Sequence, residues 1–256
     1  MLLVADVGNT NITFGAYDGD RLVADWRIAA DARRTADEYA ALLIPLAQTE
    51  SLSLSQFDEF ALASVMPRAI DPLLRFAREY LSIDFPFLLT AQADLGINIH
   101  YEPKTDVGAD RLANAVAAHQ MYEGPVIVVD LGTATTFDAI SAEGDYLGGA
   151  IAPGIEISIE ALVSQTAQLR RVQVVAPPKA IGNTTATSLQ SGFVYGFAGQ
   201  VDAIVTKFQT EMGGNARVIA TGGLAELIAL HSTTIREVDQ LLTLEGIRLA
   251  YARTKS

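Results

Sequence analysis

Short apolar runs rich in β-branched residues recur along the chain, and polar turn residues follow each of them. Leu2 to Asp6 has the composition of a buried central strand, whereas Asn11 to Tyr17 alternates apolar and polar positions as a half-buried strand does. The turn signal Asp18-Gly19-Asp20 then leads into a third segment, Arg21 to Ile28. The pattern predicts that the chain opens with three consecutive strands.

Helical spacing follows these strands. Thr35-Ala36-Asp37-Glu38 has the form of a capping box, and the leucines after it (Leu42, Leu43 and Leu46) are spaced as on one face of a helix. The further elements predicted in the first half are a strand from Phe60 to Val65, a helix from Asp71 to about Leu81, a short strand from Phe85 to Leu89 and a helix from Ala109 to Tyr122.

The second half begins with the same pattern as the first. The predicted strands are Val126 to Asp130, Thr135 to Ile140 and Tyr146 to Ile151, the last of them after the turn Glu143-Gly144-Asp145. The elements after them are helices near Ile155 to Ser164 and Thr184 to Met212, a strand from Arg217 to Ala220 and two final helices.

The two halves stay in register with each other. Asp6 and Asp130 lie 124 positions apart, and the turn glycines Gly19 and Gly144 lie 125 apart. We therefore infer an internal duplication, with one domain at residues 1–124 and a second at residues 125–256, divided at the turn dipeptide Gly124-Pro125.

Composition narrows the function classes. The chain has 256 residues, half of them hydrophobic, and a net charge of −12, which argues against a nucleic-acid surface because such surfaces need clustered Lys and Arg. It has no cysteine, which excludes disulfides and thiolate metal sites, and its three histidines are far apart. We see neither a membrane-spanning run nor a signal peptide, so we expect a soluble, cytoplasmic protein.

Each half carries a turn that suits phosphate binding. The first strand ends in Asp6-x-Gly8-Asn9-Thr10 and its counterpart in Asp130-x-Gly132-Thr133. A single copy could be an ordinary hairpin turn, but two copies favour a site where carboxylates hold Mg²⁺ through water and backbone N–H groups hold phosphate oxygens. We expect such a site in a cleft between the domains, with a hinge that closes it.

Gly108-Ala109-Asp110-Arg111 precedes the helix in the middle of the chain. One interpretation is an N-capping Asp followed by a solvent-facing Arg. The other is a kinase site for a small acidic alcohol, in which the carboxylate accepts the hydroxyl proton and the guanidinium engages a substrate carboxylate.

Other positions leave two interpretations open. Thr221-Gly222-Gly223 is either a plain strand-to-helix turn or a place where the backbone approaches an adenine ring. The glycines of Gly148-Gly149 and Pro153-Gly154 indicate a loop forced close to a ligand or a neighbouring subunit. Tyr101 alone predicts a half-buried aromatic, and Thr185 alone predicts a helix cap.

Taken together, these motifs resemble those of the type III pantothenate kinase family, within the acetate kinase–sugar kinase–Hsp70–actin superfamily. The motifs that carry the resemblance, in chain order, are Asp6-x-Gly8-Asn9-Thr10, Gly108-Ala109-Asp110-Arg111, Asp130-x-Gly132-Thr133-Ala134-Thr135, Gly148-Gly149-x-Ile151-x-Pro153-Gly154, Gly192 after Gln190-Ser191, Thr221-Gly222-Gly223 and Leu244-Glu245-Gly246. One departure lies at Thr166 to Arg170, where the family usually has Leu-Pro after Thr-Ala-x.

The resemblance implies an α/β fold of duplicated ribonuclease-H-like (actin-like ATPase) domains with mixed sheets and an interdomain cleft. It implies a homodimer that uses ATP to phosphorylate pantothenate to 4'-phosphopantothenate, the first step of coenzyme A biosynthesis.

The resemblance also implies a role for individual residues. Asp110 matches the general base, and Asp130 matches a monovalent-cation ligand for K⁺ or NH₄⁺, where the residues alone indicated Mg²⁺. The positions that match ATP contacts are Asp6, Val7, Gly8, Asn9, Thr10, Asn11, Ile12, Thr13 and Thr133, and those that match pantothenate contacts are Tyr101, Gly108, Ala109, Asp110, Arg111 and Thr185, the last from the partner subunit. Mg²⁺ is expected with ATP.

Two other functions stay open at this point. The chain could phosphorylate another small alcohol, such as a sugar, although Arg111 beside Asp110 favours a substrate with a carboxylate. It could also be a non-enzymatic accessory factor in gene regulation on the same fold, although all three aspartates of the site are present.

Overall fold

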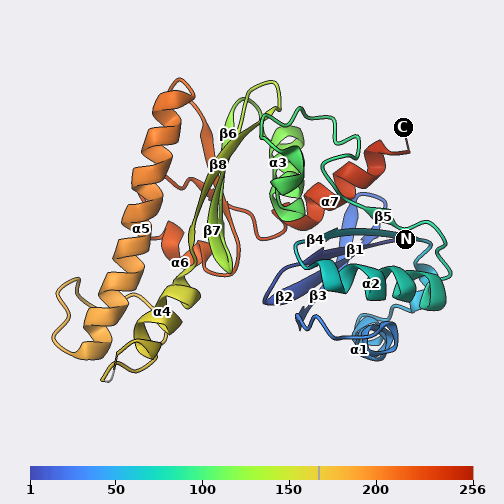
Figure 1. Ribbon diagram of the computed structural model, residues 1–256, viewed down its shortest axis with the longest axis horizontal. Helices are drawn as coiled ribbons and strands as arrows, with labels where there is room; N and C mark the ends of the chain where they lie inside the picture. The colour runs from blue at the N-terminus through green and yellow to red at the C-terminus, as the bar shows by residue number, and fades with distance from the viewer. Residues whose placement is uncertain (167, 256) are drawn as a thin grey trace. The chain divides into compact units, whose positions relative to one another are not determined.

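The computed structural model describes residues 1–166 and 168–255 (Figure 1). The family departure at Thr166 to Arg170 therefore includes one position, residue 167, outside the described residues. The chain forms two compact units. The first comprises Met1–Ile97, Tyr101–Ala117 and Leu242–Ser256, and the second comprises Asn98–His100 and Ala118–Leu241.

A five-stranded mixed sheet forms the centre of the first unit. Its strands are β1 (Leu2–Val7), β2 (Asn11–Asp18), β3 (Arg21–Ala29), β4 (Glu59–Ser64) and β5 (Phe87–Leu88), in the order β3-β2-β1-β4-β5. β1 pairs with β2 in antiparallel fashion and with β4 in parallel fashion. The predicted three-strand opening is therefore confirmed, and β1 lies at the centre of the sheet because its apolar run suits burial on both faces.

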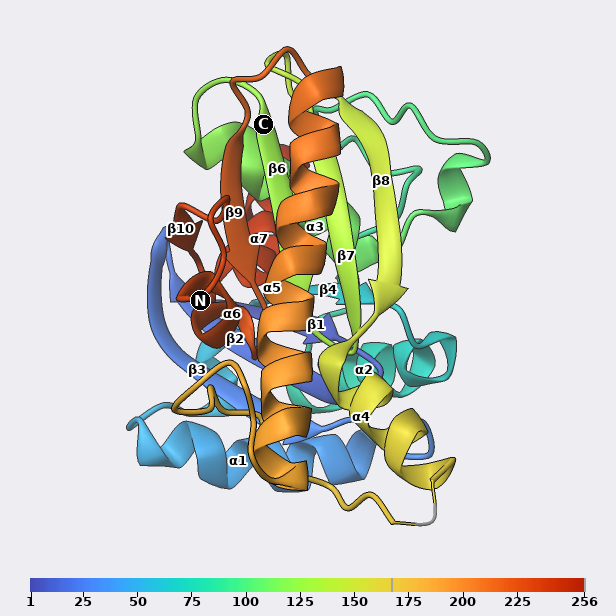
Figure 2. The same cartoon turned by 90° about the vertical axis from the view of Figure 1, so that its left-hand side faces the viewer.

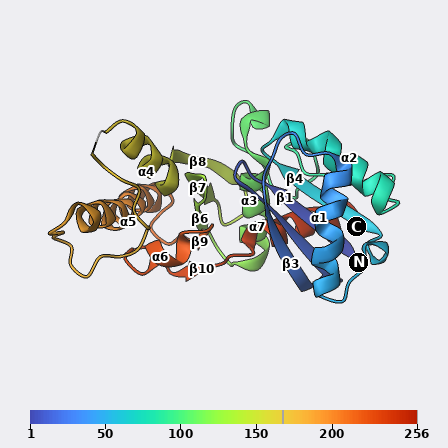
Figure 3. The same cartoon turned by 90° about the horizontal axis from the view of Figure 1, so that it is seen from below.

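Helices cover this sheet on both faces (Figure 3). They are α1 (Ala36–Thr49) and α2 (Pro67–Tyr80) on one face and α7 (Leu242–Arg253) on the other, and α3 (Ala109–Met121) begins in the same unit. The capping box at Thr35 is present, with its side chain accepting from the Glu38 N–H. The start predicted for α2, Asp71, is wrong: Pro67 occupies the first turn, where its missing N–H costs no hydrogen bond.

The second unit contains a sheet with the same topology. Its strands are β6 (Val126–Leu131), β7 (Ala134–Ile140), β8 (Tyr146–Pro153), β9 (Arg217–Thr221) and β10 (Glu237–Val238), in the order β10-β9-β6-β7-β8. Its helices are α4 (Ile155–Ser164), α5 (Thr185–Glu211) and α6 (Ala225–Ala229), and α5 runs along one face of the sheet (Figure 2). The sequence did not predict β10, which has only two residues.

The two units repeat the same strand order around equivalent central strands, β1 and β6. Asp6 of β1 pairs with Thr13 of β2, and Asp130 of β6 pairs with Thr136 of β7. Each unit has its own hydrophobic core between the sheet and its helices. The predicted duplicated ribonuclease-H-like α/β fold with mixed sheets is confirmed.

The C-terminal helix explains why the units differ from the predicted division at residue 124. α7 packs against β1 and β4, so the last residues of the chain are grouped with the first unit. Gly246 of α7 lies directly against the carbonyl of Ala113 in α3, where a Cβ would clash. Thr243 adds a hydrogen bond of 2.8 Å from its hydroxyl to Oδ1 of the buried Asn114. None of the helices in the described part of the chain is long and apolar enough to span a membrane.

Candidate active site

The first turn of the site follows β1. The Gly8 N–H donates to the Asn11 carbonyl at 3.0 Å, which closes the turn, and Asn9, Thr10 and Asn11 are exposed. A Cβ at Gly8 would lie 3.1 Å from the Asn11 carbonyl oxygen, so this close approach favours glycine. The turn therefore presents backbone groups and small polar side chains at the end of the central strand.

The predicted ATP-contact residues of this turn fall into two groups. Val7 and Ile12 are fully buried in the core, so only their backbone atoms could contact a nucleotide. Asp6 and Thr13 are partly exposed and face the same side of the sheet because they are paired in register.

The second turn repeats this construction after β6. The Gly132 N–H donates to the Ala134 carbonyl at 3.1 Å. The carboxylate of Asp130 lies between two glycines: a Cβ at Gly132 would be 3.1 Å from its Oδ1, and a Cβ at Gly222 would be 2.5 Å from it. Gly222 has a φ of +93°, which disfavours any other residue. Gly222 thus belongs to the surroundings of Asp130.

Asp130 lies in a row of oxygen-bearing side chains across three strands. Thr221 of β9 and Thr136 of β7 both pair in register with Asp130, so all three side chains are on one face of the sheet. Carboxylate and hydroxyl oxygens are ligands that hard cations prefer. A carboxylate and two hydroxyls on one face of the sheet suit a hard cation, a class that includes K⁺. Within residues 1–166 and 168–255, no group of three or more His, Cys, Asp or Glu side chains is placed to hold a metal ion.

Gly154 explains one of the close approaches predicted from the sequence. A Cβ at Gly154 would clash with the carbonyls of Thr133 and Gly132. The glycine therefore lets α4 begin directly against the second turn of the same unit. The close approach at Gly154 is therefore to the backbone of the chain's own second turn, and the contact of this loop with a ligand or a neighbouring subunit stays a prediction.

Asp110 lies near the end of β1 within the first unit. A Cβ at Gly108 would be 3.5 Å from Cγ1 of Val65, and the Val65 N–H donates to the carbonyl of Val7 at 3.0 Å. α3 begins at Ala109, so Asp110 is the second residue of the helix and not its N-cap. These contacts bring Gly108 to Asp110 to the edge of the sheet from which the first turn starts.

Burial changes the acidity of Asp110. Its pKa is raised above the ordinary value because burial disfavours the charged form, although the Arg111 N–H, 2.8 Å from Oδ1, and the positive charge of Arg111 partly oppose this. Arg111 is only 5% exposed, so the interpretation of a solvent-facing Arg is wrong. A partly buried carboxyl with a raised pKa beside a buried guanidinium is the environment expected of a general base for an acidic substrate.

Two further predicted substrate residues lie in different settings. Tyr101 is half-buried and directly follows the short segment Asn98–His100, which pairs with β8. Thr185 is exposed and is the first residue of α5, whose N-cap is Thr184, so the prediction of Thr185 as the cap is wrong by one residue.

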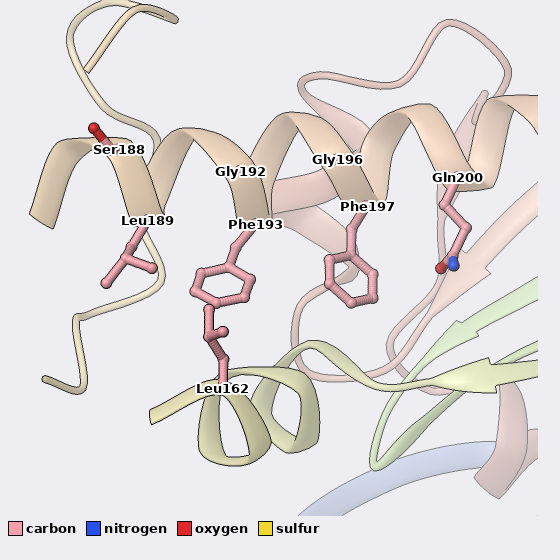
Figure 4. Close-up of a pocket in the computed structure, with 8 residues that line it drawn as sticks. All are labelled: Leu162, Ser188, Leu189, Gly192, Phe193, Gly196, Phe197 and Gln200. Carbon is pink, nitrogen blue, oxygen red and sulfur yellow. The ribbon is translucent and has the colours of Figure 1, made fainter. Parts of the chain in front are cut away.

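A separate pocket of about 330 Å³ lies between α4 and α5 (Figure 4). Leu162 of α4 points toward Phe193 of α5, and the wall of the pocket is mainly apolar. The residues that line it are Leu162, Ser188, Leu189, Gly192, Phe193, Gly196, Phe197 and Gln200. None of the predicted ATP or pantothenate contacts is among them.

Comparisons with known proteins agree with the motifs. The family model described as type III pantothenate kinase matches residues 2–207. A type III pantothenate kinase of Moorella thermoacetica is 49% identical over 253 residues, covering 99% of both chains. A type III pantothenate kinase of Geotalea daltonii is 46% identical over 255 residues, covering 100% of this chain and 99% of the relative.

A solved structure supports the fold. The putative Baf family transcriptional activator of Campylobacter jejuni has a TM-score of 0.62 at 19% identity, covering 99% of this chain and 98% of that one. At this identity, the likeness concerns the fold alone.

Proposed function

Because the chain belongs to the type III pantothenate kinase family, we propose that it transfers the γ-phosphoryl group of ATP to pantothenate, giving 4'-phosphopantothenate and ADP in the first step of coenzyme A biosynthesis. The observation that carries the proposal is the 49% identity, over 99% of each chain, to a relative of that name. Asp6, Asp110 and Asp130, on which the chemistry depends, are all present.

Asp110 is the general base of the proposed reaction. It accepts the proton of the primary hydroxyl of pantothenate as the hydroxyl oxygen attacks the γ-phosphorus, and ADP leaves from the opposite side. Its raised pKa makes the carboxylate a stronger base than an ordinary aspartate, which favours the transfer of that proton.

Arg111 is the proposed partner of the pantothenate carboxylate. Its guanidinium is buried beside Asp110, and a buried charge interacts more strongly with a substrate than an exposed one. Gly108, Ala109 and Tyr101 complete the proposed contacts within the first unit.

The two turns are the proposed phosphate-binding elements. Residues 6–13 contact ATP through the exposed Asn9, Thr10 and Asn11 and through backbone N–H groups, and Thr133 contacts it from the second turn. Positioning and charge neutralisation supply most of the catalysis in phosphoryl transfer, so backbone donors in fixed turns suit the reaction.

Asp130, with Thr136 and Thr221 beside it in register, is the proposed holder of K⁺ or NH₄⁺. When bound, a monovalent cation there and Mg²⁺ on ATP supply positive charge that offsets the phosphate oxygens. The carboxylate and hydroxyl donors support this choice for Asp130, and phosphate oxygens and water remain the main ligands for Mg²⁺.

A homodimer through α5 is part of the proposal. Gly192, Gly196 and Gly199 are exposed at helical spacing, so another helix could approach this face closely. Thr185 lies seven residues before Gly192, close to two helical turns, and therefore on the same side of α5. A partner packed on this face would receive Thr185, which supports its predicted contact with pantothenate in the partner's site.

The substrate and the location follow from the same proposal. ATP use supports the prediction of a cytoplasmic protein, and the net charge of −12 supports the absence of a nucleic-acid partner. Neither a sugar substrate nor an accessory role gains support from a specific observation.

A substrate panel tests the proposal. Purified protein with ATP, Mg²⁺ and K⁺ is given pantothenate or a hexose, and the phosphorylated product is identified by mass spectrometry. We expect phosphorylated pantothenate and little sugar phosphate. If the hexose were turned over faster than pantothenate, the substrate would be a sugar and the proposal would be wrong.

A further inference from the structure

The turn between β7 and β8 holds a piece of chain from elsewhere in the sequence. Residues Asn98–His100 are grouped with the second unit, although the residues on both sides of them are grouped with the first. Ile99 forms a parallel bridge with Tyr146 at the start of β8. The His100 N–H donates to the Tyr146 carbonyl, and the Tyr146 N–H donates to the Asn98 carbonyl, both at 2.8 Å. The segment is therefore held on the edge of β8 by a single parallel β-bridge.

One carboxylate in this turn accepts from both ends of the segment. Asp145 Oδ1 lies 2.8 Å from Asn98 Nδ2 and 3.3 Å from the Asn98 backbone N, and Oδ2 lies 3.1 Å from His100 Nε2. Hydrogen bonds to His100 and Asn98 hold the pKa of Asp145 below its ordinary value, so it is ionised at neutral pH. Hydrogen bonds to an ionised acceptor are the stronger kind.

The turn has hydrogen bonds and a packing contact of its own. Ser141 closes it through its N–H to the Asp145 carbonyl at 2.9 Å and through Oγ, which accepts from the Asp145 N–H at 3.2 Å. Gly144, at a φ of +92°, lies against the ring of His119 in α3, where a Cβ would come within 2.5 Å of the ring. Asp145 therefore lies in a turn that is closed by contacts other than those with Asn98–His100.

We propose that Asp145 is a positioning residue for pantothenate: by fixing Asn98–His100 on the edge of β8, it fixes the start of the loop that carries Tyr101. Tyr101 follows His100 directly, and a side chain can contact a ligand reproducibly only if its backbone is held. The inference rests on the proposed function, because the role of Tyr101 as a pantothenate contact does. It assigns Asp145 no contact with substrate or nucleotide.

The position of Asp145 in the chain provides a matched control. Glu143 is an exposed acid in the same turn, and none of its hydrogen bonds described here involves its carboxylate, since only its N–H is engaged, donating to Ser141 Oγ. Glu143→Gln removes the same charge as Asp145→Ala from nearly the same place, but leaves the hydrogen bonds to Asn98 and His100 intact. Asp145→Ala removes the acceptor for Asn98 and His100, and Asn98→Ala removes one of its donors.

Steady-state kinetics of these variants test the proposal. We expect Asp145→Ala to raise the KM for pantothenate about tenfold, the effect of losing a hydrogen bond to a charged group, with kcat and the KM for ATP nearly unchanged. Asn98→Ala should have a smaller effect that does not add to that of Asp145→Ala in the double variant, and Glu143→Gln should behave as wild type. An unchanged KM for pantothenate in Asp145→Ala, or equal effects of Glu143→Gln, would overturn the assignment.

Hydrogen exchange separates this inference from the proposed function. In Asp145→Ala, the amide of His100 should exchange faster than in wild type, whatever substrate the protein uses, while the amides of β6 stay protected. If wild-type protein fails to phosphorylate pantothenate, the proposed function is wrong. Faster exchange at His100 in Asp145→Ala would still show that Asp145 holds Asn98–His100 on β8. If exchange at His100 is unchanged, Asp145 does not hold the segment and the inference is wrong.

Discussion

The backbone of Gly222 lies directly against the carboxylate of Asp130. A Cβ at position 222 would be 2.5 Å from Asp130 Oδ1 and 2.7 Å from the Leu131 carbonyl carbon, and the φ of +93° disfavours any residue but glycine. Asp130 belongs to β6 and Gly222 directly follows the adjacent strand β9, and the two residues are 92 positions apart in the chain. The orientation of the proposed cation ligand therefore depends on a glycine in a different motif.

Gly222→Ala should lower turnover and raise the K⁺ concentration needed for half-maximal activity, because the new methyl displaces the Asp130 carboxylate. ADP release measured over a series of K⁺ concentrations gives both values. Gly223→Ala is the control, since a Cβ at Gly223 meets nothing within 4 Å. Equal K⁺ dependence of the two variants would contradict the proposed role of Asp130.

Asp110→Asn should lose turnover by roughly 10²–10⁴, the usual contribution of a general base. The amide cannot accept the hydroxyl proton but has nearly the same shape, so ATP should still bind with wild-type affinity in a direct binding titration. Asp106→Asn, in the exposed turn just before α3, is the control and should keep its activity. Near-wild-type turnover of Asp110→Asn would remove it from the base role.

The pH dependence of protein stability gives a second test of Asp110, independent of activity. Its pKa is raised in the folded protein, so its contribution to stability is fully present below the unfolded pKa and is lost as the pH rises through the folded value. Near neutral pH, the partly buried carboxyl of Asp110 therefore lowers the stability of the folded protein, and Asp110→Asn should raise the melting temperature there. The gain should vanish at acid pH. A variant less stable than wild type at neutral pH would contradict this.

Asp202 in α5 shows the opposite shift. Burial alone would raise its pKa, but hydrogen bonds from Ser232, Thr233 and Thr234 outweigh burial and lower it to about 2. The stability it contributes is present above the ordinary value of 3.8 and is lost as the pH falls toward about 2.

Asp202→Asn should therefore unfold at a lower urea concentration than wild type near neutral pH, and the difference should shrink as the pH falls from about 4 toward about 2. Glu211→Gln, at the exposed end of the same helix, should have little effect at any pH. If the difference in stability between Asp202→Asn and wild type stayed constant with pH, the hydrogen bonds from Ser232, Thr233 and Thr234 would not owe their stabilising effect to the negative charge of Asp202.

The exposed glycines of α5 allow the proposed dimer to be tested. Gly196→Leu adds a large side chain where a Cβ now meets nothing within 4 Å, so the monomer has room for it while a closely packed partner helix does not. Sedimentation should show a wild-type dimer and a monomeric Gly196→Leu variant. A wild-type monomer, or a variant that dimerises equally well, would contradict packing through this face.

Local patterns made much of the fold predictable. The strand pattern in residues 11–17, the capping box at Thr35 and the turn glycines Gly19 and Gly144 each act within a few residues, and the structure confirms the strand, the cap and both turns. The predicted half-buried alternation is wrong from Phe14 to Tyr17, which are all buried. The repeat of Asp6 and Asp130 predicted the duplicated topology because the two central strands begin equivalent units.

Contacts between distant parts of the chain were not predictable in the same way. The position of α7 on β1 and β4 depends on how Gly246 fits against Ala113, and no local pattern encodes that fit. The start of α2 was placed at Asp71 because Asp-Pro is a strong helix signal, whereas Pro67 already fills the first turn.

In the site, too, local motifs could be predicted from the sequence and contacts between distant residues could not. The motifs around Asp6, Asp110 and Asp130 were visible in the sequence, and the sequence also indicated a carboxylate-binding Arg111. The burial of Arg111, the contact of Gly222 with Asp130 and the anchoring of Asn98 by Asp145 are long-range features. Of these three features, only the contact of Gly222 had a signal in the sequence, because Gly222 and Gly223 form a glycine pair directly after a predicted strand.

Pantothenate-dependent release of ADP, measured with Mg²⁺ and with or without K⁺, tests the central claim most directly. We expect rapid release by the wild-type protein when ATP, pantothenate and K⁺ are all present, much slower release without K⁺, and almost none from Asp110→Asn. Release of ADP at the same rate with and without pantothenate, or none under any of these conditions, would contradict it.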